Sequence, residues 1–243
     1  MQKISQNYLK WIKSLHQKKN RDQEQCFLVE GIKICHEVIT HHSDRIKSII
    51  CTNDYLLEIS KLHDELVHTV SPSDLSRIST LKTPNSILLV LKKEKEIIFD
   101  PLQKVILLDD IQDPGNLGTL IRTADWFGIQ QFVCSPKTVD LYNAKTLQST
   151  MGSFLRVKIW YMDLMDFINA QNLHIGGALL DGGSFESKDL QEMNGLILGN
   201  ESRGVSENLR KHIDKPLKIE GSGNAESLNV AIAGAIFMQH WTK

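Results

Sequence analysis

The sequence DPGNLGTLIRTA at residues 113–124 decides the expected fold. It follows an unbroken apolar run, Val105–Leu108, which is typical of a strand buried on both faces. Asp-Pro-Gly then predicts a turn, because proline fixes φ and glycine accepts a positive φ. Apolar residues recur at helical spacing over Leu117–Phe127, and Asn116 stands where we expect the helix N-cap. The stretch therefore predicts a buried strand, a tight turn and a helix.

Arg122 is the residue of this stretch that most suggests a function. On the expected helix it points away from the apolar stripe, above the carboxyl end of a buried strand, where open α/β sheets bind ligands. The alternative is structural: Asn116 only caps the helix, and Arg122 pairs with Asp125 three residues further on. The stretch alone leaves both interpretations open.

Composition places the chain among ordinary globular proteins. Of its 243 residues, 41% are hydrophobic and 23% are charged. No apolar run is long enough for a membrane span, and the N-terminus lacks the core of a signal peptide, so we expect a soluble cytoplasmic protein. The cysteines show neither a Cys-x-x-Cys pair nor the spacing of metal ligands, and the histidines match no ligand pattern. We therefore expect buried thiols and no metal site. The four cysteines are Cys26, Cys35, Cys51 and Cys134.

Charge is close to balanced overall but uneven along the chain. The formal net charge is −1, so overall basicity does not indicate a nucleic acid partner. However, six basic residues precede the first acidic residue, Asp22: Lys3, Lys10, Lys13, Lys18, Lys19 and Arg21. This run is either a phosphate-contacting edge or a solvated helix face.

Two α/β sections are expected. Residues 1–92 are expected to form a small α/β domain, residues 93–103 a linker, and residues 104–243 a larger domain. In the small domain, helical periodicity predicts helices over 7–17 and 55–62, and the polar residues 18–22 predict a break. The larger domain alternates strand and helix signals, which predicts a parallel sheet with helices on both faces. Its expected strands are 105–108, 131–134, 157–160, 174–180, 196–198 and 217–219, and its expected helices are 117–127, 144–151, 164–170, 205–209 and 228–241. The last helix is apolar almost all round, so its own core or a partner subunit must bury it.

Two further expected strands are each followed by a polar loop that contains glycine. These are LILGNESRG at residues 196–204 and KIEGSGNAESLN at residues 218–229. Glycine lets the backbone approach a ligand closely, and polar side chains at strand ends can then contact it. The structural alternative is two ordinary turns, with Ser227 capping the last helix. Three such loops at the strand ends of one sheet favour a shared cleft.

Several enzyme classes are excluded by missing motifs. The chain has no Gly-x-x-x-x-Gly-Lys-Ser/Thr phosphate loop, no Gly-x-Gly-x-x-Gly opening a helix after a strand, and no Gly-x-Ser-x-Gly nucleophile elbow. What remains is chemistry in which a cofactor carries the reactive group.

The three loops resemble the three motifs of the SpoU (TrmH) family of RNA ribose 2′-O-methyltransferases, within the SPOUT superfamily. The resemblance covers residues 104–243 and keeps the order and spacing of the motifs. Between them, TVDLYNAK at 138–145 and STMGS at 149–153 are similar to the middle section of the family. FLVEG at 27–31 resembles the start of the N-terminal RNA-binding domain, related to a large-subunit ribosomal protein, that many members carry.

The resemblance implies a fold and partners. The fold is a C-terminal parallel-sheet α/β domain with a deep trefoil knot, joined to a small N-terminal α/β RNA-binding domain. The cofactor is S-adenosylmethionine, bound in bent form inside the knot, and the protein is a homodimer whose active sites use both subunits. The substrate is structured RNA, with ribosomal RNA favoured over transfer RNA because of the N-terminal domain. The other readings are a member that binds RNA without methylating it and, least favoured, a small-molecule methyltransferase.

The resemblance also assigns residues. Those implied to hold the cofactor are Leu180, Leu198, Gly199, Asn200, Ile219 and Leu228. Those matching the catalytic and substrate-positioning residues of the family are Asn116, Arg122, Glu201, Ser227 and Asn229. The arginine of the family is often described as the base, but a guanidinium is effectively never deprotonated. We therefore expect Arg122 to bind the phosphate and to lower the pKa of the ribose hydroxyl by its charge.

One departure from the family lies in the third loop. Glu220 stands where the family usually has proline, and Gly221 where it has a hydrophobic residue. Proline restrains a loop, so the substitution is expected to loosen the segment that contacts the cofactor and to add a negative charge beside it. It is also the feature that keeps the non-catalytic reading open.

Overall fold

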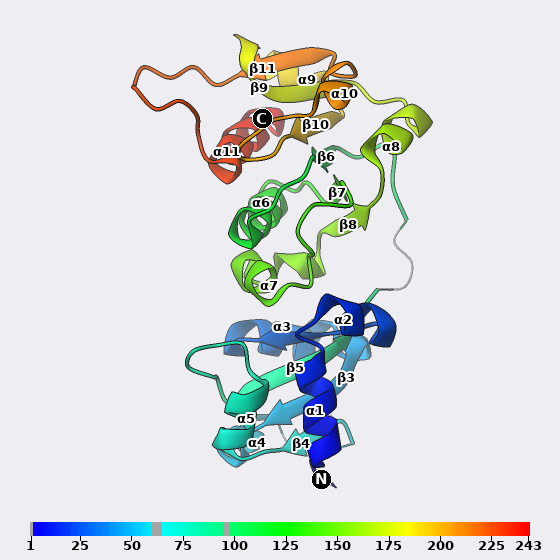
Figure 1. Cartoon of the computed structure of the whole chain (residues 1–243), viewed down its shortest axis with the longest axis vertical. Helices are drawn as coiled ribbons and strands as arrows, with labels where there is room; N and C mark the ends of the chain where they lie inside the picture. Colours follow the sequence, from blue (N-terminus) through cyan, green and yellow to red (C-terminus); the bar gives the residue numbers. More distant parts are fainter. Residues whose placement is uncertain (1, 60–64, 95–97) are drawn as a thin grey trace. The chain divides into compact units, whose positions relative to one another are not determined.

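The chain forms two compact units in the computed structural model, which describes residues 2–59, 65–94 and 98–243 (Figure 1). The first unit is Met1–Glu96 with Tyr142–Gln148, and the second is Ile97–Leu141 with Ser149–Lys243. The domain bounds expected from the sequence, 1–92 and 104–243 with a linker at 93–103, stay a prediction.

The first unit is built on a mixed five-stranded sheet with strand order β1-β4-β3-β5-β2. Strand β5 pairs antiparallel with β2 and β3, whereas β4 pairs parallel with β1 and β3. The strands are β1 (Gln2–Lys3), β2 (Cys26–Glu30), β3 (Ile46–Cys51), β4 (Val67–Thr69) and β5 (Ile87–Lys92). The helices are α1 (Gln6–Ser14), α2 (Lys18–Glu24), α3 (Ile32–His41), α4 (Asn53–Ile59) and α5 (Pro72–Ile78), with a short 3-10 turn at Ser43–Arg45.

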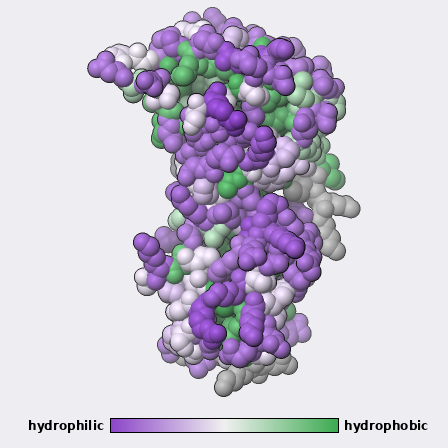
Figure 2. Space-filling view, in the orientation of Figure 1, coloured by the Kyte–Doolittle hydropathy of each residue, from purple (hydrophilic) through white to green (hydrophobic). Residues whose placement is uncertain are grey.

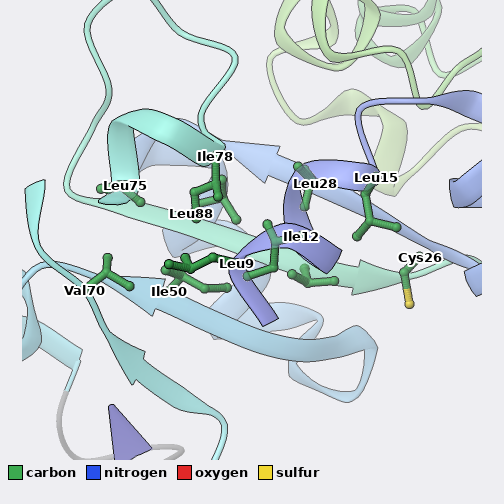
Figure 3. Close-up of a cluster of buried hydrophobic side chains, with 11 residues drawn as sticks. Leu9, Ile12, Leu15, Cys26, Leu28, Ile50, Val70, Leu75, Ile78 and Leu88 are labelled. Atoms are coloured by element: carbon green, nitrogen blue, oxygen red, sulfur yellow. The ribbon is translucent and has the colours of Figure 1, made fainter. Parts of the chain in front are cut away.

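One core of this unit lies between α1, α5 and the sheet (Figure 3). Leu9 and Ile12 of α1 and Leu15 at its C-cap are buried, recur at helical spacing, and belong to one apolar cluster with Ile50 of β3 and Leu88 of β5. The apolar stripe that predicted the helix is thus the stripe that it buries.

The expected break at residues 18–22 is wrong, because α2 begins at Lys18. The helix expected over 7–17 ends at Ser14, and Arg21 of α2 then turns back onto it. The Arg21 guanidinium is buried and donates to the backbone oxygens of Leu15 (3.0 Å) and His16 (2.7 Å). A charged side chain that satisfies the free carbonyls beyond one helix thus holds the start of the next. The helix expected over 55–62 is α4, and residues 60–62 lie outside the described residues.

The second unit contains a six-stranded sheet with strand order β11-β9-β10-β6-β7-β8. All five neighbouring pairs are parallel, as the βα alternation predicted. The strands are β6 (Val105–Leu108), β7 (Gln131–Cys134), β8 (Lys158–Tyr161), β9 (Ile175–Ser184), β10 (Gly195–Leu198) and β11 (Lys215–Lys218). The helices are α6 (Pro114–Trp126), α8 (Leu164–Ala170), α9 (Ser187–Gln191), α10 (Glu207–Arg210) and α11 (Val230–Trp241), with a 3-10 turn at Ser153–Leu155. Helix α7 (Ala144–Thr150) belongs to the first unit up to Gln148.

Helix α9 was not predicted, and β9 continues to Ser184 rather than ending at 180. The short helix starts with a reciprocal cap in which the Glu186 and Asp189 side chains each bond the backbone of the other residue. A helix of one turn leaves too little apolar periodicity to be recognised in a sequence.

The apolar helix α11 packs on α6 through Gly234. A Cβ at this position would lie 2.5 Å from a Leu120 methyl and 3.1 Å from a Leu198 methyl, so only glycine allows the two helices to come this close. The buried face of α11 consists of Val230, Ala231, Gly234, Phe237, Met238 and Trp241. On the opposite face the Ile232 side chain is 52% exposed, so the described residues leave this face uncovered.

All four cysteines are free and buried, as expected of small apolar residues. Burial raises the pKa of the Cys51 thiol to about 11 and raises that of Cys134 further. Within the described residues, no helix is both long and apolar enough to cross a membrane.

Candidate functional site

The candidate site lies where the sheet of the second unit changes direction. Strand β6 has β7 on one side and β10 on the other, and Leu108 and Leu198, the last residues of β6 and β10, are register partners. The chain therefore leaves two neighbouring strands at the same edge, at the switch point where open α/β sheets bind ligands. The loops at 109–113 and 199–206 follow these two strands.

Helix α6 is capped by Asp113, not by Asn116 as the sequence suggested. The Asp113 carboxylate accepts from the Asn116 backbone N–H at 2.9 Å, and Pro114 occupies the first helical position, where its missing N–H costs nothing. Aspartate followed by proline is itself a typical start of a helix, so the N-cap expected at Asn116 is three residues too late. Asn116 consequently lies in the first turn, and its side chain is available for other contacts.

Three of the predicted catalytic residues form one hydrogen-bonded chain. The Asn229 amide donates to Asn116 Oδ1 at 2.9 Å, and the Asn116 amide donates to Glu201 Oε1 at 2.9 Å. The Glu201 carboxylate also accepts from the backbone N–H groups of Gln112 (3.4 Å) and Asp113 (3.3 Å). Residues that are 85 and 113 positions apart in the sequence are thus joined, one from each of the three motif loops.

The 199–206 loop folds back on itself through Gly199 and Asn200. Asn200 and Gly204 exchange backbone hydrogen bonds at 3.0 and 2.9 Å, and a Cβ on the buried Gly199 would lie 2.2 Å from the backbone of Gly204. The Asn200 side chain accepts from Ser202 N and Arg203 N and donates to the Asp110 carbonyl at 2.7 Å. Only glycine at 199 and a short amide at 200 allow this turn.

Two aspartates that the sequence reasoning left without a role fasten this loop. The buried Asp109 accepts from Ser206 N at 2.8 Å. Asp110, with φ of 59°, accepts from Ser135 Oγ at 2.6 Å and from the Arg203 guanidinium at 3.2 Å. Both directly follow the β6 strand, so their position at a strand end was the available signal.

Arg122 is exposed and has no hydrogen bond or ion pair among the residues that the structure describes. The alternative that it pairs with Asp125 is wrong, because Asp125 forms a bidentate ion pair with Arg156, with a shortest distance of 2.8 Å. Within the described residues, no hydrogen bond or ion pair joins Arg122 to the chain formed by Asn116, Glu201 and Asn229. Its guanidinium therefore remains available for an anion.

The third loop is open along its whole length. Every residue from Glu220 to Asn229 is exposed, and Figure 1 shows the segment between β11 and α11 as a long loop at the border of the unit. Asn229 caps α11 by accepting from Ala231 N (2.9 Å) and Ile232 N (3.3 Å), so the structural alternative in which Ser227 caps this helix is wrong. Ser227 makes no hydrogen bond to the rest of the described chain.

The residues assigned to the cofactor differ in accessibility. Leu198 and Gly199 are buried, Ile219 and Asn200 are half-buried, and Leu180 and Leu228 are exposed by 67% and 48%. Large apolar side chains with this exposure, Leu180 within β9 and Leu228 in the loop before α11, suit a planar, partly apolar ligand such as adenine. Glu220, the departure from the family, lies 3.5 Å from the Lys218 ammonium, which offsets its charge. The residues present therefore fit S-adenosylmethionine.

The site combines backbone turns, a fixed amide–carboxylate chain and an unpaired guanidinium. In the part of the chain that the structure describes, no three His, Cys, Asp or Glu side chains gather at metal-binding distances. Such an arrangement can orient a polar ligand and neutralise an anion.

Residues 103–239 match the model of the SpoU rRNA methylase family, and residues 6–89 match that of the MRM3-like substrate binding domain. The chain is 35% identical over 233 residues to the 23S rRNA (guanosine(2553)-2′-O)-methyltransferase RlmP of Bacillus subtilis, covering 94% of this chain and 93% of RlmP. It superposes on a TrmH-family protein of Porphyromonas gingivalis with a TM-score of 0.85 and 36% identity, covering 99% and 98% of the two chains. The AdoMet-bound rRNA methyltransferase of Sinorhizobium meliloti gives a TM-score of 0.85 and 26% identity, with 99% and 96% covered.

Proposed function

Because the chain belongs to the SpoU rRNA methylase family, we propose that it transfers the methyl group of S-adenosylmethionine to a ribose 2′-hydroxyl of ribosomal RNA. RlmP, which this chain resembles over nearly the full length of both proteins, is named as a methyltransferase of 23S rRNA. This favours ribosomal over transfer RNA as the substrate and the cytoplasm, where ribosomes are assembled, as the location.

The observation that carries this proposal is the Asn116–Glu201–Asn229 chain. It joins the three motif loops at the switch point of the sheet, beside the turn at Gly199 and Asn200. Because the Asn116 amide uses its oxygen and its nitrogen at once, its orientation is fixed, and the polar groups around it are preorganised. A hydrogen bond without a functional role would not require residues from three separate loops to converge.

The cofactor supplies the electrophilic methyl group, so the protein must align a ribose hydroxyl and help it lose its proton. In our proposal Arg122 binds the phosphate beside the target ribose, and its charge lowers the pKa of the 2′-hydroxyl. The proton leaves to phosphate or water. Asn116, Glu201, Ser227 and Asn229 position the substrate, while backbone groups at Leu198, Gly199, Asn200, Ile219 and Leu228 hold the cofactor with Leu180 lining the pocket.

The test is transfer of labelled methyl from S-adenosylmethionine to an unmodified transcript of 23S rRNA, followed by mapping of the methylated ribose. Transfer to one ribose, lost when the 2′-hydroxyl at that position is replaced by hydrogen, supports the proposal. No transfer to 23S rRNA by a protein that binds the cofactor would refute it.

Cofactor binding gives a sharper prediction. Calorimetric titration with S-adenosylmethionine is expected to show one site per chain with a micromolar dissociation constant. Leu180→Asp is expected to weaken binding about tenfold or more, because a carboxylate beside a bound apolar group loses its hydration. Leu102→Asp is the matched control, since Leu102 is 94% exposed and lies outside the three loops. Equal affinity for the Leu180 variant and the wild type would remove Leu180 from the site.

The finer features of the family are also part of the proposal. We infer a trefoil knot in residues 104–243 and an RNA-binding role for residues 1–92. The match of residues 6–89 to a substrate-binding domain supports the second of these inferences.

A homodimer is supported by the uncovered faces of α6 and α11. Ile232 of α11 and Trp126 of α6 are 52% and 84% exposed, and the two helices pack side by side. Apolar groups of this size exposed on neighbouring helices mark an interface. We expect Ile232→Glu to convert a dimer into a monomer at micromolar concentration in analytical ultracentrifugation, and Lys33→Glu, on the exposed face of α3, to leave the mass unchanged. A wild-type protein that sediments as a monomer would contradict the dimer.

A further inference from the structure

The basic run at the N-terminus separates into fixed and free residues. Arg21 is buried against the end of α1, and Lys18 pairs with Asp22 at 2.6 Å. Lys10 and Lys13 of α1 are exposed and have no ion pair among the residues that the structure describes. Lys19 of α2 is also exposed without an ion pair in the described chain, but only Lys10 and Lys13 lie on the same helix.

The fold of α1 places these two lysines together. Leu9, Ile12 and Leu15 face the core, so at about 100° per residue Lys10 points to the opposite side and Lys13 to the flank beside Leu9. Residues three apart on a helix have Cβ atoms about 5–6 Å apart. Two uncompensated charges therefore lie side by side, and the helix stays folded because its apolar face is buried.

An aromatic and cationic group lies on the flank of the same helix. The rings of Tyr8 and Trp11 stack with centroids 5.1 Å apart and planes 12° apart, and the His68 ring of β4 lies 5.2 Å from Tyr8. The Lys47 ammonium of β3 lies 4.5 Å from the centre of the Trp11 ring. The aromatic ring holds this third charge in place. Trp11 and this ammonium lie about 160° round α1 from Lys13, so they belong to the other flank of the helix. We call Lys10 and Lys13 the α1 face.

We propose that the α1 face binds the sugar–phosphate backbone of the RNA substrate. This inference rests on the proposed function and specifies where the first unit contacts RNA. Unpaired lysines next to one another match a polyanion, whose binding releases counterions. A membrane would require an exposed apolar stripe, and the stripe of α1 is buried. In Figure 2 the front of this unit, which carries α1 in Figure 1, is largely hydrophilic, which suits a wet, charged interface.

The test compares the double variant Lys10→Ala/Lys13→Ala with Lys33→Ala/Lys82→Ala. Both remove two exposed lysines of the first unit that lack an ion pair in the described chain, so they change the net charge equally. The probe is the unmodified 23S rRNA transcript, bound at several salt concentrations. We expect the first variant to reduce the slope of log K against log salt by about 2, one unit for each lost phosphate contact. The control variant is expected to keep the wild-type slope.

Methyl transfer to the same transcript provides the second measurement. The Lys10→Ala/Lys13→Ala variant is expected to raise KM with kcat unchanged, because the α1 face binds the RNA away from the reacting atoms. Lys47→Met, which keeps the apolar stem over Trp11, is expected to keep the wild-type slope, because Lys47 lies on the other flank of α1. Equal slopes for the Lys10/Lys13 variant and wild type, or an equal loss in the control variant, would overturn the proposal. Failure of the proposed function is distinguishable, since it would abolish methyl transfer by the wild type while the binding slopes remain measurable.

Discussion

Replacing Arg122 by alanine is expected to lower kcat for methyl transfer to 23S rRNA by about 10²- to 10³-fold, the usual cost of removing one preorganised charge-stabilising group. The guanidinium is exposed and unpaired in the described chain, so its loss disturbs no internal contact. The expected effect therefore lies in the chemical step. It is measured with labelled cofactor under saturating RNA, and circular dichroism and cofactor binding are expected to stay unchanged.

Two further variants test whether the positive charge of Arg122 accounts for the effect. Arg122→Lys keeps the charge and is expected to recover part of kcat. Arg156→Ala removes an exposed arginine of the same unit whose partner is Asp125, and it is expected to keep the wild-type kcat because a surface ion pair contributes at most about 1 kcal/mol. Full activity of Arg122→Ala would show that the guanidinium has no role in the reaction.

Gly199→Ala is expected to abolish cofactor binding, with a rise in the dissociation constant of about 100-fold or more. Its Cβ would meet the backbone of Gly204 and Val205 at 2.2 Å, so the turn of the second loop would have to open. Overpacking of this kind costs about 1–3 kcal/mol or more, and the opened turn would no longer present its backbone to the ligand. Calorimetric titration with S-adenosylmethionine measures the loss.

The matched control is Gly183→Ala. Gly183 lies in β9 of the same sheet, and a Cβ at this position has no atom within 4 Å. It is expected to bind the cofactor like the wild type. A Gly199→Ala protein that binds the cofactor normally would show that the backbone at this turn does not hold it.

The elements of the sheet were predictable because their signals are local. The apolar run at 105–108 and the helical spacing after it identify β6 and α6, and the βα alternation gave the parallel sheet. Helix boundaries were less predictable, because they depend on single capping contacts. Asp113 rather than Asn116 starts α6, and Asn229 rather than Ser227 starts α11.

The contacts of the site were beyond sequence reasoning. The motifs indicated which loops converge, but the bond from Asn229 to Asn116 depends on how closely α11 approaches α6, and Gly234 sets that distance. The Asp125–Arg156 pair, which leaves Arg122 free, also joins residues 31 positions apart. Three-dimensional packing decides both, so a local pattern does not contain them.

The bond between Asn116 and Asn229 also sets a time order for biosynthesis. The two residues are 113 positions apart, and at about 5–20 residues per second a ribosome needs on the order of ten seconds to translate the distance between them. A nascent chain that has completed α6 therefore waits for the last helix before its motif loops can be joined. A chain truncated before Asn229 would leave Asn116 without its partner. The three motif loops can consequently be joined only after translation has passed Asn229.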